Sequence, residues 1–414
     1  MNAAFPPPTA ADTSNFVERL FATRKLTLDL AAPLSDADAT LQPFTEASPA
    51  KWHLAHTTWF FETFVLRDHA AGYQPFDERF HFLFNSYYEG EGARLDRSRR
   101  GMLSRPTLDE VRAYRAAIDE ALDRALPSLK ADALALIELG INHEQQHQEL
   151  LLTDLLAAFA ESPLEPAYGE LPPPACYATE PFTIHAGQQG VVEIGAAGPG
   201  FAFDSERPRH RTFLEPHQIA NRRVTNGEWR EFVADGGYRK PALWLSEGWD
   251  WVRRSGVTAP LYWRSEETEF TLAGRRAIDW AAPVAHVSYY EGDAFARWAG
   301  ARLPSEAEWE SFAASADPCL GNQLDEAGAV IPKPGGGMFG DAWEWTRSAF
   351  ASYPGFAPAE GAVGEYNGKF MCGQFVLKGA SCATPRGHSR ASYRNFFPPD
   401  ARWQFTGLRL ARDS

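Results

Sequence analysis

The stretch that most constrains the fold is a proline-free run from about Ala131 to Phe159, which is rich in Leu, Ala, Glu and Gln and contains one glycine. This composition favours an α-helix. Residues four apart lie one above the other on the same helix face, so His143 and His147 can hold one metal ion between them. Two histidines at this spacing, with acids and amides around them, favour a metal site over a hydrogen-bonded core pair. A third ligand has to come from elsewhere.

The segment His143-Glu144-Gln145-Gln146-His147 also satisfies the H-E-x-x-H pattern of zinc peptidases, in which the glutamate is the general base. A zinc peptidase is therefore the main alternative that the residues suggest. The residues that follow include Leu150, Leu151 and Thr153, and they lack the glycine and the third histidine of the extended peptidase motif. If Glu144 is not a general base, we expect its replacement by glutamine to be tolerated.

Composition limits the class of protein. The 414 residues are enough for two or three domains, and the net charge of -14 argues against a large nucleic-acid footprint. The N-terminus shows no export signal and no apolar run is long enough to span a bilayer, so we predict a cytoplasmic protein without a membrane partner. Neither a disulfide framework nor a thiolate zinc site is expected, because no C-x-x-C pair occurs among Cys176, Cys319, Cys372 and Cys382.

Three further helices are predicted before the histidine helix. The first covers residues 14–32, where apolar residues recur at helical spacing. The second begins at Ser48-Pro49, where the serine would cap the helix and the proline would take its first position, and it adds His53 and His56. The third begins with the capping box Thr107-Leu108-Asp109-Glu110. Four helices with histidines on two of them predict a helical bundle with a metal site in its core.

A long connection, residues 71–106, joins the second and third helices and is rich in aromatic residues and arginine. Loops of this length are usually either functional or disordered, and the aromatic content speaks against disorder. We therefore predict an active-site loop that includes Tyr87, Tyr88, Arg97 and Arg100. For either tyrosine taken alone, simple packing is an equally good interpretation.

The two halves of the chain carry motifs that resemble known families. Leu54-Ala55-His56 with Trp59, and the His143-x-x-x-His147-x-Glu149 helix, resemble a DinB-type four-helix bundle. From about Phe182 onward, short segments, glycines and tryptophans predict an irregular α+β domain. This half resembles the formylglycine-generating-enzyme type domain, a variant of the C-type lectin fold, through Val224-Thr225-Asn226, Arg302-Leu303-Pro304-Ser305-Glu306-Ala307-Glu308-Trp309 and Trp343-Glu344-Trp345-Thr346.

Together, and in this order, the halves resemble the ergothioneine-pathway sulfoxide synthases. The resemblance implies a multidomain α plus α+β protein with a flexible leader at 1–13, an iron-binding bundle at 14–162, a linker at 163–181 and the second domain at 182–414. Members of that family use a mononuclear non-haem iron, Fe(II), and O2. They join the sulfur of a thiol to C2 of the imidazole of hercynine, the trimethylated betaine of histidine, and leave a sulfoxide.

Carried over by motif, the iron ligands are His56, His143 and His147, with His53 as a supporting or packing residue. Three neutral imidazoles on one side of an ion would leave positions open for substrate sulfur and O2. Tyr87 and Tyr88 correspond to the tyrosine pair that lies beside the iron in cysteine-using members, where a phenol can supply a proton.

The resemblance also implies a set of substrate-binding residues. Gln146 would orient the hercynine imidazole, and Asn395 with Phe396 would receive its carboxylate and trimethylammonium groups, the latter through cation–π attraction. Arg97 and Arg100 are candidates for binding the cysteine carboxylate, since guanidinium groups suit carboxylates. Arginines in a polar loop are as often solvated.

The resemblance implies cysteine as the sulfur donor, because Phe397 stands at the position where members that use γ-glutamylcysteine carry an acidic residue. The alternative within the family is a selenoneine synthase, which joins the selenium of a seleno-sugar to hercynine, and another relative attaches sulfur to C5 of histidine. Cys382 lacks the closely spaced partner with which formylglycine-generating enzymes bind copper, so the second domain is expected to form a substrate wall. A binding protein without catalysis would leave the three histidines and the aromatic loop unexplained.

Overall fold

The computed structural model describes residues 10–171, 180–359, 364 and 367–414. The chain divides into two compact units. Unit 1 comprises Met1–Leu164, Gly198–Phe201 and Glu326–Gly328, and unit 2 comprises Glu165–Ala197, Ala202–Asp325 and Ala329–Ser414. Residues 1–9 of the predicted leader, residues 172–179 of the predicted linker and Cys176 lie outside the described residues.

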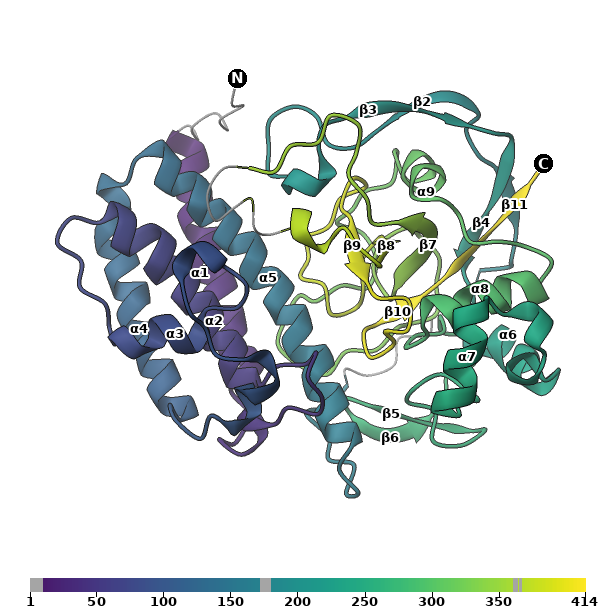
Figure 1. Cartoon of the computed structure of the whole chain (residues 1–414), viewed down its shortest axis with the longest axis horizontal. Coiled ribbons are helices and arrows are strands. Elements are labelled where there is room, and N and C mark those ends of the chain that lie inside the picture. Colours follow the sequence, from purple (N-terminus) through teal and green to yellow (C-terminus); the bar gives the residue numbers. More distant parts are fainter. Residues whose placement is uncertain (1–9, 172–179, 360–363, 365–366) are drawn as a thin grey trace. The chain divides into compact units, whose positions relative to one another are not determined.

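Four long helices dominate unit 1, and Figure 1 shows them side by side: α1 (Ala10–Ala31), α2 (Ala50–Phe61), α4 (Leu108–Ala125) and α5 (Ala131–Ala160). Helix α5 packs against both α1 and α2, and α2 also packs against α4. Every side chain of α2 is buried, as expected for a helix with neighbours on several faces. A π-helical turn, η2 (Glu62–Arg67), continues α2 without a break.

Local sequence signals explain most of the helix ends, with three differences from expectation. The Thr107–Glu110 capping box begins α4 as predicted. Helix α1 begins at Ala10, four residues before the predicted start. The N-cap of α2 is Pro49, not Ser48, and the Ser48 hydroxyl that would cap the helix accepts a hydrogen bond from Arg100 Nη1 instead (2.9 Å). The backbone N–H of Ser48 donates to Asp154 Oδ2 (2.7 Å). The predicted loop at 71–106 contains the short helix α3 (Glu78–Phe84), which is capped by Asp77.

Gly140, the glycine within α5, permits a close approach between α5 and α2. A Cβ atom at this position would lie 2.6 Å from Cε1 of Phe61 and 3.1 Å from Cε1 of Phe60, two side chains of α2 that are at most 1% exposed. The first distance is shorter than real Cβ contacts and the second is tight, so any larger residue at this position would force Phe61 to move within the packed core. The contact lies about one helical turn from His143, so it helps to set the spacing at which His56 and His143 face each other.

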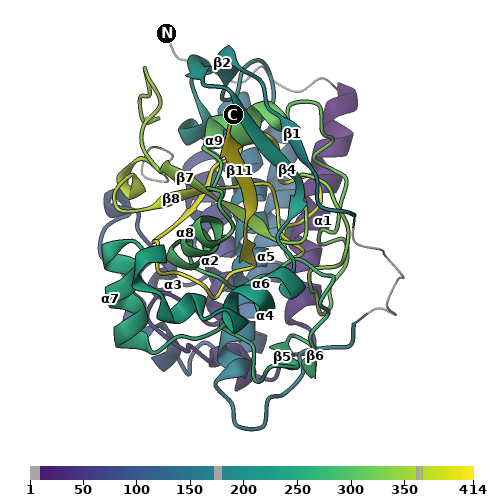
Figure 2. The ribbon, with the colours of Figure 1, turned by 90° about the vertical axis from the view of Figure 1, so that its right-hand side faces the viewer.

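Unit 2 is built from short strands and helices. A three-stranded antiparallel sheet has the order β1 (Ile184–Ala186), β4 (His217–Arg223), β11 (Arg409–Asp413), and Figure 2 shows β4 beside β11. A four-stranded sheet has the order β10 (Thr406–Gly407), β7 (Trp343–Ala349), β8 (Phe375–Lys378), β9 (Asn395–Phe397). Two hairpins complete the strands: β2 (Gly190–Ile194) with β3 (His210–Leu214), and β5 (Thr268–Thr271) with β6 (Gly274–Ala277). The helices are α6 (Asn226–Ala234), α7 (Ser246–Ser255), α8 (Tyr289–Trp298) and α9 (Glu306–Phe312).

The motifs of unit 2 meet at the buried carboxylate of Glu344. It accepts hydrogen bonds from Trp309 Nε1 (2.6 Å) and from Nε and Nη2 of Arg409 (2.8 Å each), and Arg223 Nε lies 2.9 Å away. The Arg302–Trp309 motif also contains the Ser305 and Glu308 capping box of α9. These residues therefore hold strands and helices together by pairing buried charges and capping helices.

In the part of the chain that the structure describes, no helix has the length and apolar character needed to cross a membrane.

Candidate metal centre

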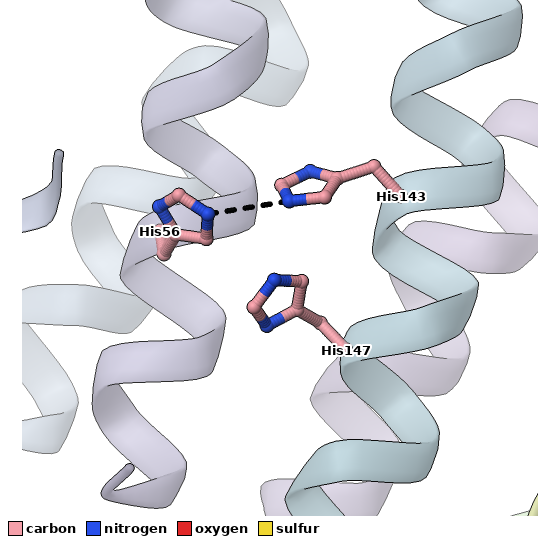
Figure 3. Close-up of side chains that lie close together, drawn as sticks. All are labelled: His56, His143 and His147. Atoms are coloured by element: carbon pink, nitrogen blue, oxygen red, sulfur yellow. Dashed lines mark hydrogen bonds between the residues drawn. The ribbon is translucent and has the colours of Figure 1, made fainter. Parts of the chain in front are cut away.

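Three buried histidines from two helices of unit 1 lie close together. His56 comes from α2, and His143 and His147 come from successive turns of α5. One ring nitrogen from each residue lies within 4.8 Å of the others, and Nε2 of His56 is 3.2 Å from Nε2 of His143. Figure 3 shows a nitrogen of each ring directed toward the space between the three. The sequence prediction that these side chains share one site agrees with this geometry.

The triad meets the chemical requirements of a metal site. Burial lowers the pKa of His143 to about 3, and burial together with neighbouring histidines holds the pKa values of His56 and His147 well below their ordinary value. All three imidazoles are therefore neutral near pH 7, the form that binds metals. Nitrogens about 2.1 Å from one ion and at about 90–110° to each other lie roughly 3.0–3.4 Å apart, which matches the His56–His143 distance of 3.2 Å.

His56 is held in place on its other side. Its Nδ1 lies 2.6 Å from the backbone carbonyl oxygen of Phe84, which is compatible with a donated hydrogen bond that leaves Nε2 free to bind a metal. Trp52 and Trp59 stack on the imidazole from α2 itself, at centroid distances of 4.6 and 5.6 Å. The ring is thus fixed by one hydrogen bond and two aromatic faces.

His53 is not in the triad but contacts one of its members. Its Nδ1 lies 2.8 Å from Nδ1 of His147, and its Nε2 lies 3.1 Å from Oδ2 of Asp154 on α5. Asp154 is the neighbour of the site that the sequence analysis missed. A signal existed, because Asp154 follows His147 by seven residues and therefore lies on the same face of α5.

Glu144 belongs to an ion cluster between α1, α4 and α5. Its carboxylate is fully buried and accepts hydrogen bonds from Thr27 Oγ1 (2.6 Å), Arg24 Nη1 (3.1 Å) and Arg115 Nη2. Burial raises its pKa, but Arg115 and Arg24 outweigh that effect and leave the pKa below the usual range. A carboxylate held by two arginines is a poor general base, so the geometry argues against the peptidase alternative.

The two arginines predicted to bind a substrate carboxylate differ in environment. Arg100 is 2% exposed, its guanidinium lies 3.4 Å above the Trp52 ring, and it donates to Ser48 Oγ (2.9 Å) and Ser86 Oγ (3.0 Å). Burial, reinforced by Arg97, lowers the pKa of Arg100, and Asp154 is near enough to act in the opposite direction although no ion pair between Arg100 and a described carboxylate is formed. Arg97 is exposed and donates to the backbone carbonyl of Glu46. Burying a guanidinium without an ion-pair partner costs free energy, and a bound anion would offset this cost.

The tyrosine pair lies next to the aromatic residues around the triad. Tyr87 is half-buried and stacks on Tyr88 at 4.7 Å, and Tyr88 is buried against Phe64 (5.1 Å) and Trp59 (5.6 Å). Trp59 contacts both Tyr88 and His56, so this ring connects the predicted loop to the triad. The catalytic role of the pair stays a prediction.

The remaining predicted residues lie in two places. Gln146 is half-buried on α5, immediately before His147. Asn395 and Phe396 belong to β9 of unit 2, where Phe396 stacks on Phe350 at 4.0 Å and Asn395 Oδ1 accepts a hydrogen bond from the backbone of Phe396 (2.9 Å). Their contact with a substrate stays a prediction.

Two family models match the chain. Residues 19–151 match the DinB superfamily, and residues 172–328 and 336–414 match the sulfatase-modifying factor enzyme 1-like domain. The chain therefore belongs to a class of proteins with a DinB-type helical domain followed by a formylglycine-generating-enzyme type domain. This confirms the predicted fold.

Curated relatives narrow the class to one family. The hercynine oxygenase of Mycobacterium tuberculosis is 34% identical over 410 residues, covering 91% of this chain and 94% of the relative. The hercynine oxygenase of Mycolicibacterium smegmatis is 32% identical over 434 residues, covering 96% and 98%. Ergothioneine biosynthesis protein 1 of Schizosaccharomyces pombe is 26% identical over 234 residues, covering 51% of this chain and 28% of that protein. The chain belongs to the hercynine oxygenase family.

Proposed function

We propose that this protein is an oxidoreductase of ergothioneine biosynthesis that uses non-haem Fe(II) and O2 to join the sulfur of cysteine to C2 of hercynine as a sulfoxide. The observation that supports this most strongly is the convergence of three buried, neutral histidines, His56, His143 and His147, in a member of the hercynine oxygenase family. The reaction balances with O2 as the four-electron oxidant: the thiol and the C2–H bond each lose hydrogen, one oxygen atom enters the sulfoxide and the other leaves as water.

The donor set fits iron and leaves room for substrate. Imidazole nitrogens suit iron, zinc and copper alike, so the preference for iron rests on the oxygenase names of the relatives. Iron bound by three histidines would supply open positions for a thiolate and the redox chemistry that O2 requires. The protein residues then have to bind and orient the two organic substrates and deliver protons.

Arg100 is the proposed partner of the cysteine carboxylate. Its buried guanidinium, which has hydroxyl partners but no ion pair among the described residues, would gain a charge-assisted hydrogen bond from such a ligand. Arg100 stacks on Trp52, and Trp52 stacks on His56, so a carboxylate bound here would place the thiol near the triad. We assign the exposed Arg97 only a contribution to the local potential.

Gln146, Asn395 and Phe396 are proposed to bind hercynine. An amide can donate to or accept from the imidazole, and the stacked rings of Phe396 and Phe350 offer the aromatic faces that attract a trimethylammonium group. Tyr87 or Tyr88 is proposed to supply a proton during bond formation, which would direct the reaction away from simple oxidation of the thiol.

The test is anaerobic reconstitution of the full chain with Fe(II), followed by O2 exposure with hercynine and, in parallel, cysteine, γ-glutamylcysteine or a seleno-sugar. Product masses are read by mass spectrometry, and a His143→Ala variant is the control. Hercynylcysteine sulfoxide from wild type alone is the expected result. A selenium adduct alone would assign the selenoneine reaction instead, and no hercynine adduct with any donor would overturn the proposal.

A further inference from the structure

The contact between His147 and His53 extends the triad into a hydrogen-bonded chain. His147 Nδ1 lies 2.8 Å from His53 Nδ1, and His53 Nε2 lies 3.1 Å from Asp154 Oδ2. His53 and Asp154 are 2% and 4% exposed, so water does not compete effectively for these bonds. The chain crosses from α5 to α2 and returns to α5.

The carboxylate of Asp154 sets the direction of the hydrogen bonds in this chain when both imidazoles are neutral. A carboxylate only accepts, so the proton between His53 and Asp154 resides on His53 Nε2. A neutral His53 then has a lone pair on Nδ1, and it accepts a hydrogen bond from Nδ1–H of His147. A neutral His147 protonated at Nδ1 has its remaining lone pair on Nε2, the nitrogen directed into the triad in Figure 3.

Asp154 is itself fixed by the start of α2. Its Oδ2 also accepts the backbone N–H of Ser48 (2.7 Å), and Ser48 Oγ accepts a hydrogen bond from Arg100 Nη1 (2.9 Å). Because Ser48 directly precedes the N-cap residue of α2, the carboxylate is tied to the backbone of the helix that provides His53 and His56. Its orientation is therefore determined by backbone and not only by a flexible side chain.

We propose that His53 and Asp154 are positioning residues that hold His147 in the tautomer and ring orientation required to bind a metal through Nε2. This inference rests on the proposed metal site, and it goes further by assigning roles to two residues outside the triad. Hydrogen-bonded partners of metal-binding histidines typically change metal affinity by about 10–100-fold. A purely structural link between α2 and α5 would instead change stability and leave metal affinity unaltered.

The experiment compares metal affinity and apo-protein stability in the full chain. Co(II) and Fe(II) are titrated anaerobically into wild type, Asp154→Ala and His53→Phe, and thermal unfolding of each apo-protein is recorded. Glu62→Ala is the matched control, because Glu62 is also a buried carboxylate and begins η2, the continuation of α2, but accepts hydrogen bonds from Tyr73, Tyr114 and the backbone of Phe76. We expect about 10–100-fold weaker metal binding in the first two variants and less than about threefold change in the control.

Equal metal affinity in wild type, Asp154→Ala and His53→Phe would overturn the inference while leaving the metal site intact. Failure of wild type to bind either metal would instead remove the proposed function. A second measurement needs no variant: nitrogen-15 NMR of the histidine rings in the wild-type Zn(II) complex. The expected spectrum has His53 protonated at Nε2 and His147 at Nδ1, and the opposite tautomer of His53 contradicts the proposal.

Discussion

Replacement of Glu144 by glutamine tests whether this residue is structural or catalytic. In the folded protein Glu144 faces Arg24 and Arg115, whose side chains are 1% and 0% exposed, and Asp119 pairs with Arg24 from a position that is 22% exposed. The glutamine variant therefore leaves one buried positive charge without compensation. Breaking such a buried pair on one side costs about 3–5 kcal/mol. The expectation from sequence that this change is tolerated is thus replaced by an expectation of marked destabilisation.

The loss can be read as a shift in the melting temperature. For a domain of this size about 1 kcal/mol corresponds to roughly 2–4 °C, so the first thermal transition should fall by about 6–20 °C. Circular dichroism of the apo-protein measures it, with Glu138→Gln as the matched control. Glu138 pairs with Arg19 across the same two helices, α1 and α5, but the pair is 22% and 47% exposed. An exposed pair contributes about 0–1 kcal/mol, so the control should shift the transition by less than about 4 °C.

A Glu144→Gln variant that melts no lower than Glu138→Gln would refute this reasoning about the buried cluster. The peptidase hypothesis predicts a different result for the same variant: normal stability and bound zinc, but no peptide hydrolysis. The structural and the peptidase interpretations of Glu144 therefore predict different melting temperatures as well as different activities.

Three further perturbations follow from the structure. Gly140→Ala should lower the melting temperature, because overpacking against Phe61 costs about 1–3 kcal/mol whereas the higher helix propensity of alanine contributes only about 1 kcal/mol. A more stable variant would contradict the close approach of α5 and α2 at this residue. Burial, reinforced by Arg390, lowers the pKa of His388 to about 3, below its unfolded value, so this residue contributes stability that is lost as pH drops below about 6.5. Chemical denaturation at about pH 7.5 and pH 5 should show that the loss of stability is smaller in His388→Gln than in wild type by an amount on the order of 2 kcal/mol, while the other buried histidines contribute equally to both proteins. Replacing both Tyr87 and Tyr88 by phenylalanine should slow sulfoxide formation by the iron-loaded enzyme by about 10²–10⁴-fold and shift its products toward oxidised thiol. An unchanged product ratio would exclude the pair as proton donors.

Much of the histidine triad could be predicted because its signals are local. The spacing of His143 and His147 fixes their common face on α5, and the absence of proline fixes the helix itself. The capping box at Thr107 likewise gives the start of α4. The choice of His56 as third member of the triad required the DinB-like motif, because periodicity alone does not distinguish it from His53.

The other features depend on contacts between distant segments, which no local pattern reports. The N-cap of α2 is Pro49 and not the predicted Ser48, whose hydroxyl accepts a hydrogen bond from Arg100, far along the chain. Glu144 stands inside a catalytic motif by letter, but its side chain is turned to Arg24 and Arg115 on other helices. In both cases the decisive partner is a buried charge whose position only the packed bundle defines.

The triad also has a consequence for the folding of the chain. His56 and His143 are 87 residues apart in sequence, and bringing two such points together costs an unfolded chain about 4 kcal/mol in loop-closure entropy. A metal ion held by both would be a removable cross-link, and its stabilisation of the bundle would increase with the concentration of free metal. Unit 2 supplies none of the three ligands, so metal limitation would loosen the bundle first and expose it to proteolysis before the rest of the protein.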